Sequence, residues 1–452
     1  MARSILTEEE KQKIRDSLKA TRKRRQNQSI KVFELKVNCH QTSKETFGRM
    51  DNCFKQAKWI ENDMIAWGEK GTVNNIFKYE YLDHRTIQRK DKDGNFVSEK
   101  ISLPVYFHRA LVKQVKKDIV NLSKAKKKGN NVGKLKFKSE VNCIPIITGG
   151  IKIIDNSHIT IPGFPKLKVY GLDQLKKFEN YEIADGRFIR KASGFYIKVS
   201  VCSEKENRSP KKNYREVGLD FGIKDNIVTS DGEKFNCRVQ ESEQLKYLQK
   251  QLHRKQKGSK RYYRLIKQIR CEYEHLSNKK ADEANKIISY FLKKYDIVYF
   301  QDENISEWKK KKRNKKTGRK VRCFSFGKQV QGSYLGRVKT KLVSLENDMS
   351  FKISKWSPTT KFCPNCGCFN KVGLDERIYR CECGYQLDRD VHAARNVKLF
   401  GSTERAECLE QASVETLASA GLEQFQYGKL SRRSENESSS LKAETSSQAM
   451  KI

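Results

Sequence analysis

The stretch VGLDFGI, residues 217–223, is the segment around which the rest of the chain can be arranged. Its apolar residues predict a first β-strand, and two glycines flank a single carboxylate, Asp220. A second strand is predicted over residues 226–230, closed by the turn Asp231-Gly232. A lone aspartate in a strand is usually a solvated or turn-capping residue. The meaning of Asp220 therefore depends on the acidic residues that follow it along the chain.

A second acidic position follows a predicted buried strand. Residues 281–295 have apolar side chains at helical spacing, and residues 297–300 form a short apolar run typical of a buried strand. That run ends in QDEN, residues 301–304. Carboxylates at the exit of a buried strand lie at a sheet edge, where ligand sites gather. Glu303 lies deeper in this turn, but spacing alone does not choose between it and Asp302.

The third acidic position is Asp390, within LDRDVHAARN, residues 387–396. It opens a predicted helix, where a carboxylate is stabilised by the helix dipole, so a capping role is one interpretation. Three carboxylates at strand ends and a helix start also fit a two-metal phosphoryl-transfer site. Two Mg²⁺ ions need several hard oxygen ligands that tertiary structure brings together.

The composition of the chain points to a polyanionic partner. Its 452 residues allow two to four domains, and 94 Lys and Arg against 54 Asp and Glu give a formal charge of +40. Such an excess favours a long nucleic acid as the partner. A membrane surface is disfavoured, because no run of about 18 apolar residues exists and the N-terminus lacks the apolar core of a signal peptide.

The first half of the chain predicts helices set within a β-rich region. Helices are predicted over residues 7–25, 43–67 and 103–122, and a strand over 30–37. From residue 137 to 203 the apolar period changes to two, which predicts an antiparallel barrel or sandwich of short strands. Its first strand contains Pro145 and is therefore expected at a sheet edge. If the strand at 30–37 joins this sheet, the helices are an insertion between its strands.

Three basic segments are candidates for contact with phosphates. One follows residue 124, a second is a predicted helical hairpin over 244–280 that turns near Gly258, and the third, 309–322, holds ten Lys or Arg in fourteen residues. Residues 401–452 instead carry a net −2 and few apolar residues, which predicts a disordered tail. The predicted nucleic-acid contacts are Lys134, Lys136, Lys138, Arg254, Lys255, Arg261, Lys309, Lys310, Lys311, Lys312 and Arg313.

A cysteine cluster predicts a structural zinc site. Cys363 and Cys366 form one knuckle, and Cys381 and Cys383 form a second. Thiolates paired at two tight turns supply a tetrahedral Zn²⁺ site with no open position. The second knuckle is C-x-C, tighter than the usual C-x-x-C, and Cys368 is a spare thiol that could substitute for one ligand. Five cysteines in so short a segment also favour a reducing compartment over a disulfide scaffold.

These motifs together resemble a known family. GLDFG (218–222), FQDEN (300–304), SPTTKFCPNCG (357–367) and CECGYQLDRDVHAARN (381–396) are similar to TnpB, the OrfB-type proteins of insertion sequences, which are related to compact type V CRISPR effectors. Upstream, KKGNNVGKLKFK (127–138) and IRKASGFYIKVSV (189–201) resemble the barrel of that family. The resemblance covers roughly residues 30 to 400.

The resemblance implies an RNA-guided DNA endonuclease with catalytic residues Asp220, Glu303 and Asp390, two Mg²⁺ ions and a structural Zn²⁺. His392 stands where the family commonly has Asn. The implied partners are a guide RNA from the element's end and target double-stranded DNA, with no membrane, in the nucleoid-associated cytoplasm of a prokaryotic cell. A CRISPR effector and a non-cleaving RNA-guided repressor remain alternatives, although the intact acidic trio disfavours the repressor. Direct transposase activity lacks a matching Tyr-His motif.

The implied fold is multidomain, α/β and β, with a wedge β-barrel, an inserted helical recognition domain, and a RuvC nuclease domain of RNase H-like fold interrupted by a zinc ribbon. The expected parts are an N-terminal basic helix (1–29), the first barrel strand (30–42), the helical insertion (43–130), the wedge barrel (131–205), the RuvC domain (206–355), the zinc ribbon (356–387), the RuvC C-terminal helix (388–400) and the disordered tail (401–452).

Overall fold

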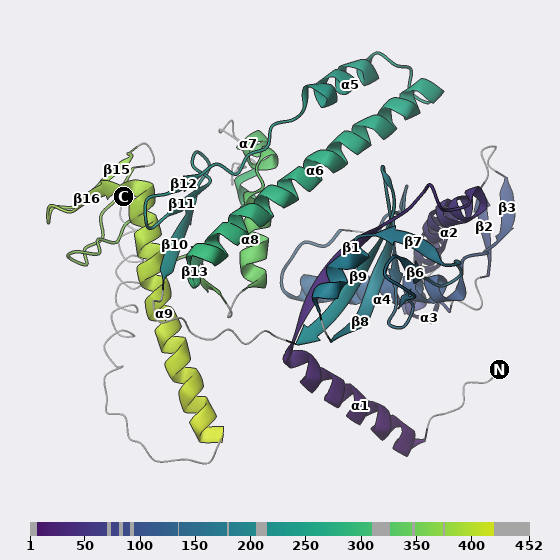
Figure 1. Cartoon of the computed structure of the whole chain (residues 1–452), viewed down its shortest axis with the longest axis horizontal. Coiled ribbons are helices and arrows are strands. Elements are labelled where there is room, and N and C mark those ends of the chain that lie inside the picture. The colour runs from purple at the N-terminus through teal and green to yellow at the C-terminus, as the bar shows by residue number, and fades with distance from the viewer. Residues whose placement is uncertain are drawn as a thin grey trace, which may run out of the picture. The chain divides into compact units, whose positions relative to one another are not determined.

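The computed structural model describes residues 7–69, 74–80, 85–90, 95–133, 135–178, 180–204, 215–309, 326–345, 349–373 and 376–419. These residues fall into two compact units (Figure 1). Unit 1 lies within Met1–Pro210 and Glu241–Asn278, and unit 2 within Lys211–Gln240 and Lys279–Ile452. Because each unit has its own sheet, each is described by itself.

Unit 1 is built on a seven-stranded sheet with the order β4-β8-β9-β1-β7-β6-β5. Its pairings are antiparallel. The strands are β1 (Gln28–Val37), β4 (Cys143–Ile146), β5 (Lys152–Ile153), β6 (His158–Thr160), β7 (Leu167–Tyr170), β8 (Tyr181–Lys191) and β9 (Gly194–Glu204). The strand with Pro145 is an edge strand, as predicted, because proline cannot donate a ladder hydrogen bond. The early strand β1 joins the sheet between β9 and β7, which confirms that the helices after it are an insertion.

The inserted helices share one hydrophobic core with this sheet. They are α2 (Lys44–Glu69), α3 (Asn74–Lys78) and α4 (Val105–Lys127), with a hairpin of β2 (Thr86–Lys90) and β3 (Phe96–Lys100) between them. Phe54 of α2 and Phe107 of α4 pack against Phe188 of β8, with ring centroids 4.8 and 6.1 Å apart. All three rings are fully buried, so the insertion is held by the same apolar contacts that stabilise the sheet.

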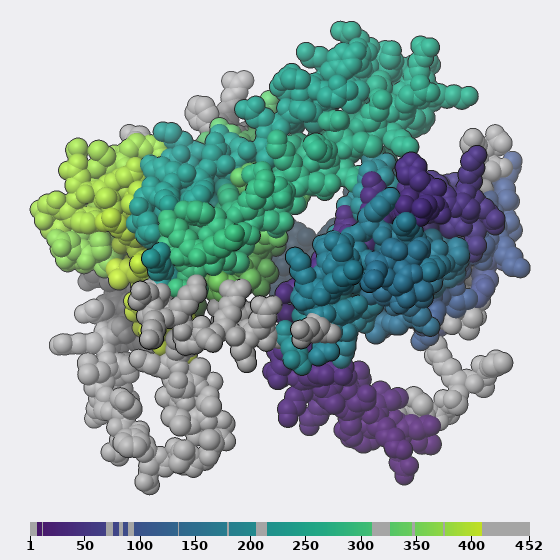
Figure 2. All heavy atoms as spheres, in the orientation of Figure 1, coloured from purple at the N-terminus to yellow at the C-terminus, as the bar shows by residue number. Residues whose placement is uncertain are grey.

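Unit 1 also contains an N-terminal helix and most of a helical hairpin, whose second helix continues into unit 2. The N-terminal helix α1 (Glu8–Gln26) begins with the predicted capping box of Thr7 and Glu10. The predicted helical hairpin is also present: α5 (Glu243–His253) is followed by a turn at Gly258 and by α6 (Lys260–Lys294). Leu245 and Leu248 of α5 pack against Ile269 of α6. The remaining side chains of the hairpin form a largely exposed ridge (Figure 2).

Unit 2 contains a five-stranded sheet with the order β12-β11-β10-β13-β14. The strands are β10 (Glu216–Phe221), β11 (Ile227–Thr229), β12 (Lys234–Phe235), β13 (Ile297–Gln301) and β14 (Ser350–Ile353). β10, β11 and β12 are antiparallel neighbours, whereas β10, β13 and β14 run parallel. Every residue of β13 is buried, as its apolar sequence predicts. A two-stranded antiparallel ribbon, β15 (Ile378–Arg380) and β16 (Gln386–Asp388), flanks the second pair of cysteines, Cys381 and Cys383.

Helix α9 (Arg389–Ser419) lies along this sheet beside β10 (Figure 1). Val397 of α9 packs with Ile297, Tyr299 and Ile353 of the parallel strands. The close crossing requires a glycine, because a Cβ atom on Gly218 would collide with the backbone oxygen of Ala394. Shorter elements of unit 2 are η2 (Glu307–Lys309), α7 (Gly327–Gly332) and α8 (Leu335–Ser344), while η1 (Leu172–Lys177) belongs to unit 1.

The start of the predicted disordered tail is helical instead. Helix α9 continues to Ser419, which corrects the expectation of disorder from residue 401 for this part of the chain. The physical reason is local, because TERAECLEQA is rich in strong helix formers. Arg405 also lies 3.9 Å from the Glu216 carboxylate at the start of β10. Residues 420–452 lie outside the described residues. No helix in the described part of the chain is long and apolar enough to cross a membrane.

Candidate functional site

The three predicted carboxylates lie on adjacent elements of unit 2. Asp220 is near the end of β10, and Glu303 comes two residues after the end of β13. These two strands are parallel neighbours, with Leu219 opposite Phe300, so Asp220 near the end of β10 and Glu303 after β13 lie at the same edge of the sheet. Asp390 is the second residue of α9, the helix that lies along these strands.

The charges of Glu303 and Asp390 both act on Asp220. Burial, together with the negative charges of Glu303 and Asp390, raises the pKa of Asp220 to about 8. Burial also raises the pKa of Glu303, while the nearby Lys339 opposes that shift. Among the described residues, the group of side chains close enough to hold a metal ion is the four cysteines, and the three carboxylates do not form such a group. This donor set of partly buried carboxylate oxygens suits a hard divalent cation, which would relieve the repulsion.

Lys339 separates the roles of Asp302 and Glu303, which the sequence left open. Its ammonium lies 2.7 Å from the Asp302 carboxylate and also donates to the backbone oxygen of Glu303. Lys352 lies 4.0 Å from the same carboxylate. The hydrogen bond from Lys339 holds the pKa of Asp302 below its usual range. Asp302 is thus paired with lysines, whereas the Glu303 carboxylate interacts electrostatically with Asp220.

Asp388 and Asp390 also differ in their hydrogen-bond partners. One oxygen of Asp388 accepts hydrogen bonds from the backbone N–H groups of Asp390 and Val391, at 3.0 and 3.2 Å. Its other oxygen accepts from Lys234 at 2.9 Å. Asp388 is therefore the capping carboxylate of α9, so the capping interpretation of Asp390 is wrong.

Two arginines that the sequence did not single out lie beside Asp390. Arg389 has its guanidinium 3.4 Å from the Asp390 carboxylate, and Arg377 lies 3.8 Å from the other oxygen. Arg389 also lowers the pKa of Asp220, against the larger effect of burial. Neither these arginines nor Lys339 could be chosen from a chain with 94 Lys and Arg, because their importance depends on tertiary contacts.

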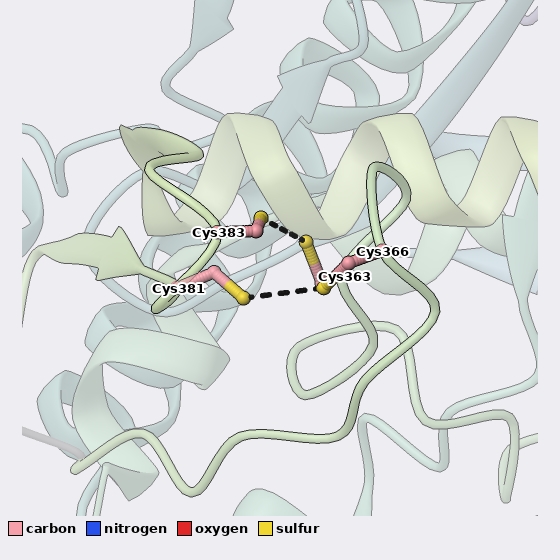
Figure 3. A group of neighbouring side chains, drawn as sticks. All are labelled: Cys363, Cys366, Cys381 and Cys383. Carbon is pink, nitrogen blue, oxygen red and sulfur yellow. Dashed lines mark hydrogen bonds between the residues drawn. The ribbon is translucent and has the colours of Figure 1, made fainter.

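Cys363, Cys366, Cys381 and Cys383 form a compact group (Figure 3). Their sulfur atoms all lie within 4.8 Å of one another, with Cys363 and Cys383 3.7 Å apart and Cys366 and Cys381 3.5 Å apart. A tetrahedral zinc site with Zn–S bonds of about 2.3 Å has sulfur–sulfur edges of about 3.8 Å. The four thiols therefore fit a structural Zn²⁺ ion.

The structure of the two knuckles places Cys368 outside the group of four thiols that fit zinc. Gly367 and Gly384 adopt positive φ angles of 76° and 86°, and each N–H donates to the carbonyl of a cysteine that begins its knuckle. Cys368 is exposed and lies outside the group of four, with its sulfur turned to the backbone oxygen of Cys366. The tighter C-x-C spacing thus still permits the predicted ligand set.

His392 joins α9 to the cysteine-bearing segment. Its ring is fully buried and stacks on Tyr379 with a centroid distance of 3.7 Å. Its Nε2 atom lies 3.1 Å from the amide of Asn396, which donates to the backbone oxygens of Thr359 and Phe362. Burial lowers the pKa of His392 to about 4, so this ring is neutral at pH 7. The residue that departs from the family pattern therefore has a packing role here.

The basic residues predicted to contact nucleic acid are distributed over both units. Lys138 is paired with Glu61, so its charge is partly neutralised. The others in the described residues are exposed or half-buried: Lys136, Arg254, Lys255, Arg261 and Lys309. Lys134 and residues 310–313 lie outside the described residues. Contact between these side chains and a nucleic acid stays a prediction.

The match to a family model lies in unit 2. The family model described as "Cas12f1-like, TNB domain" matches residues 345–397, which include β14, the four cysteines and Asp390. A candidate RNA-guided DNA endonuclease from Streptomyces pristinaespiralis is 26% identical over 189 residues, 41% of this chain and 45% of that protein. A second, InsQ from Escherichia coli K12, is 27% identical over 214 residues, 45% of this chain and 53% of its own length. The comparisons confirm the predicted relationship to the TnpB family.

Other matches carry the same family name or a related one. The TnpB-like protein L79 of Acanthamoeba polyphaga mimivirus is 27% identical over 150 residues, 32% of this chain and 27% of that protein. A solved Cas12f1–sgRNA–target DNA complex aligns over 79% of this chain and 83% of its own, at 14% identity and a TM-score of 0.45. The chain spans about half the length of the first two curated relatives.

Proposed function

We propose that this chain is an RNA-guided, Mg²⁺-dependent DNA endonuclease of the TnpB type, which cuts DNA at a single site formed by Asp220, Glu303 and Asp390. The observation that carries the proposal is that three carboxylates 83 and 87 residues apart in the sequence come from two neighbouring parallel strands and the helix packed on them. The names of the similar proteins, which describe RNA-guided DNA endonucleases, support this activity over other phosphoryl transfers.

The topology of unit 2 supports a nuclease domain of the RuvC type. Counted along the chain, the strand order is 3-2-1-4-5, with the first three strands antiparallel and the last two parallel to the first. That arrangement, with acidic residues on strand 1, after strand 4 and on a covering helix, is consistent with an RNase H-like fold. The half-barrel sheet and inserted helices of unit 1 would be the wedge and recognition parts.

The residues of the site would have separate roles in phosphodiester hydrolysis. Asp220, Glu303 and Asp390 would hold two Mg²⁺ ions, which lower the pKa of a bound water and stabilise charge on the leaving oxygen. Lys339 fixes the turn that carries Glu303, through Asp302 and the Glu303 backbone oxygen. Asp388 fixes the first turn of α9 and so positions Asp390. Arg377 and Arg389 supply positive charge beside the cluster.

The four cysteines would hold a structural Zn²⁺ that keeps the ribbon folded next to α9. Because the ligand set is closed, zinc contributes to folding here and leaves no position for substrate. Target selection would come from base pairing with a guide RNA, while the protein binds the backbone and a short flanking motif of double-stranded DNA. The charge of +40 suits both partners, and the expected location is the nucleoid-associated cytoplasm of a prokaryotic cell.

The test is to purify the chain with the RNA it binds, sequence that RNA, and then exchange its variable end for a new guide. Purified complexes with Mg²⁺ should cut only DNA that matches the guide supplied, and the Asp220→Asn complex should bind the same DNA without cutting it. Cleavage that ignores the guide would contradict RNA guidance. Guided binding without cleavage by the unaltered chain would instead favour the non-cleaving repressor.

A further inference from the structure

Trp356 is the most exposed large apolar side chain in the described part of the molecule, with 81% of its surface accessible. It lies in the turn that follows β14, three residues after the strand ends. Single exposed apolar residues are common on protein surfaces and carry no meaning by themselves. Two neighbouring features give this indole a specific role.

The first feature is that the turn is fixed to the strand leading to the carboxylates. Gln301, the last residue of β13, is buried and its amide donates to the backbone oxygens of Ser354 and Ser357, at 3.2 and 2.9 Å. These two carbonyls lie on either side of Trp356 in the sequence. The backbone N–H of Trp356 donates to the Ser354 hydroxyl at 3.2 Å. The same Gln301 precedes Glu303 by two residues. The turn that carries the indole therefore follows β14 at the sheet edge where Asp220 and Glu303 lie.

The second feature is a lysine over the indole ring, with two more lysines on neighbouring elements. The Lys355 ammonium lies 4.5 Å from the centre of the Trp356 ring, which leaves the opposite face accessible. Lys339 and Lys352 lie 2.7 and 4.0 Å from the Asp302 carboxylate. Lys355 also lowers the pKa of Asp302, so all three lysines act on this carboxylate.

We propose that Trp356 stacks on an unpaired base of the DNA strand that enters the carboxylate site, with Lys352 and Lys355 binding the adjacent phosphates. An exposed aromatic ring flanked by cations is the combination that binds single strands without reading their sequence. The proposal rests on the proposed function, because the carboxylates define which strand is presented. It adds the requirement that the strand be unpaired where it passes Trp356, since a paired base does not offer a free face.

The experiment separates stacking from charge by using two probes. One is a fluorescent 12-nucleotide oligothymidine, and the other is a backbone of the same length and charge that lacks bases. Affinities of the full-length chain for both are measured without added Mg²⁺, so that no cleavage occurs. The variants are Trp356→Ala and Trp356→Phe, and the control is Trp67→Phe, which alters a 42%-exposed indole on α2 in unit 1.

The unaltered chain should bind oligothymidine about tenfold more tightly than the base-free backbone, because stacking on one aromatic ring is worth about 1–3 kcal/mol per base. Trp356→Ala should reduce this ratio to near one, and Trp356→Phe should keep part of it. Trp67→Phe should leave it unchanged. Oligothymidine should also quench the tryptophan fluorescence of the control more than that of Trp356→Phe.

The proposal is overturned if Trp356→Ala still binds oligothymidine about tenfold more tightly than the base-free backbone. It is also overturned if this variant loses the same amount of affinity for both probes. Because Trp356 is exposed, these substitutions leave the core intact, and the conservative Phe variant checks this directly. The outcome is independent of cleavage. If the chain performs guided cleavage but Trp356→Ala keeps its preference for oligothymidine over the base-free backbone, only the stacking proposal fails. If Trp356→Ala loses this preference but the unaltered chain does not perform guided cleavage, only the proposed function fails.

Discussion

The cysteine cluster and the carboxylate cluster lie in the same unit but are assembled in different ways. The four cysteines are brought together by two tight turns within 21 residues of chain, and their sulfur atoms lie within 4.8 Å of one another. The carboxylates come from two strands and a helix that span 171 residues, from Asp220 to Asp390. Burial and mutual repulsion raise the pKa of Asp220 to about 8.

The difference teaches that one cluster is fixed locally and the other by tertiary structure. Local hydrogen bonds of the turns place the thiols, so the cysteine site depends on its metal and on short-range geometry. The carboxylates are placed by the packing of α9 on the sheet and by Lys339 and Asp388. Loss of a cysteine or of zinc should therefore unfold the cysteine-bearing segment. Loss of a carboxylate should reduce activity without unfolding the protein.

Removing zinc should have the largest effect on stability. Chelation, or Cys363→Ser, should unfold the ribbon, because zinc in such sites contributes on the order of 10 kcal/mol to folding. Limited proteolysis should then cut between residues 356 and 387, and cleavage of DNA should fall in parallel. The matched control is Cys368→Ser, which should be nearly neutral because this thiol lies outside the group of four. Full protease resistance after zinc removal would contradict a structural site.

Removing one carboxylate should have the largest effect on activity at unchanged stability. Asp220→Asn, Glu303→Gln and Asp390→Asn should each lower single-turnover cleavage by about a thousandfold, roughly 4 kcal/mol, because each removes a ligand for the catalytic cations. Binding of RNA and DNA should stay within about twofold. Asp302→Asn and Asp388→Asn are the matched controls and should be milder, since these groups hold Lys339 and the start of α9. Wild-type rates in the Glu303 variant would move the assignment to Asp302.

His392, at the junction of the two clusters, should make stability depend on pH. Its folded pKa of about 4 lies below the ordinary value of 6.5, so the unfolded chain takes up the proton first as pH falls. Stability contributed by the neutral ring should be present above pH 6.5 and lost as pH falls toward 4, by about 3 kcal/mol. The measurement is the free energy of unfolding in urea for the unaltered chain and for His392→Asn, which does not titrate. A constant difference between the two across this pH range would rule out the buried neutral histidine.

Truncating the chain should have the smallest effect. Deletion after Cys408 keeps Arg405 beside Glu216 and should leave the melting temperature unchanged. Deletion after Gly401 removes Arg405 and should cost about 0–1 kcal/mol, as for other partly exposed ion pairs. Guided cleavage should survive both deletions. A large loss of affinity for nucleic acid in either variant would show that the tail takes part in binding.

Much of the fold could be predicted from the sequence because its elements have strong local signals. The capping box of Thr7 and Glu10, the glycine turn at Gly258 and the apolar run of β13 each specify their structure within a few residues. The β2–β3 hairpin was missed, because its sequence is polar and lacks a clear period. The helical start of the tail was also missed, since polarity predicts exposure but does not distinguish an exposed helix from a disordered chain.

The candidate site could be predicted in part. The cysteine spacing identified the four thiols, and family resemblance identified Asp220, Glu303 and Asp390, although their catalytic role remains a prediction. The sequence could not separate Glu303 from Asp302, because that choice depends on Lys339, 36 residues away on α8. It likewise took Asp390 for a potential cap, when Asp388 makes those hydrogen bonds.

The central claim, that carboxylates far apart in the sequence hold common metal ions, can be tested by replacing Mg²⁺ with Fe²⁺. With ascorbate and peroxide, bound iron generates hydroxyl radicals that cut the nearby polypeptide backbone. The account predicts three groups of cuts, around residues 220, 303 and 390, all lost together in Asp220→Asn while the zinc content is unchanged. Cuts at one of these segments without the others, or persistence of all three in Asp220→Asn, would contradict a shared metal site.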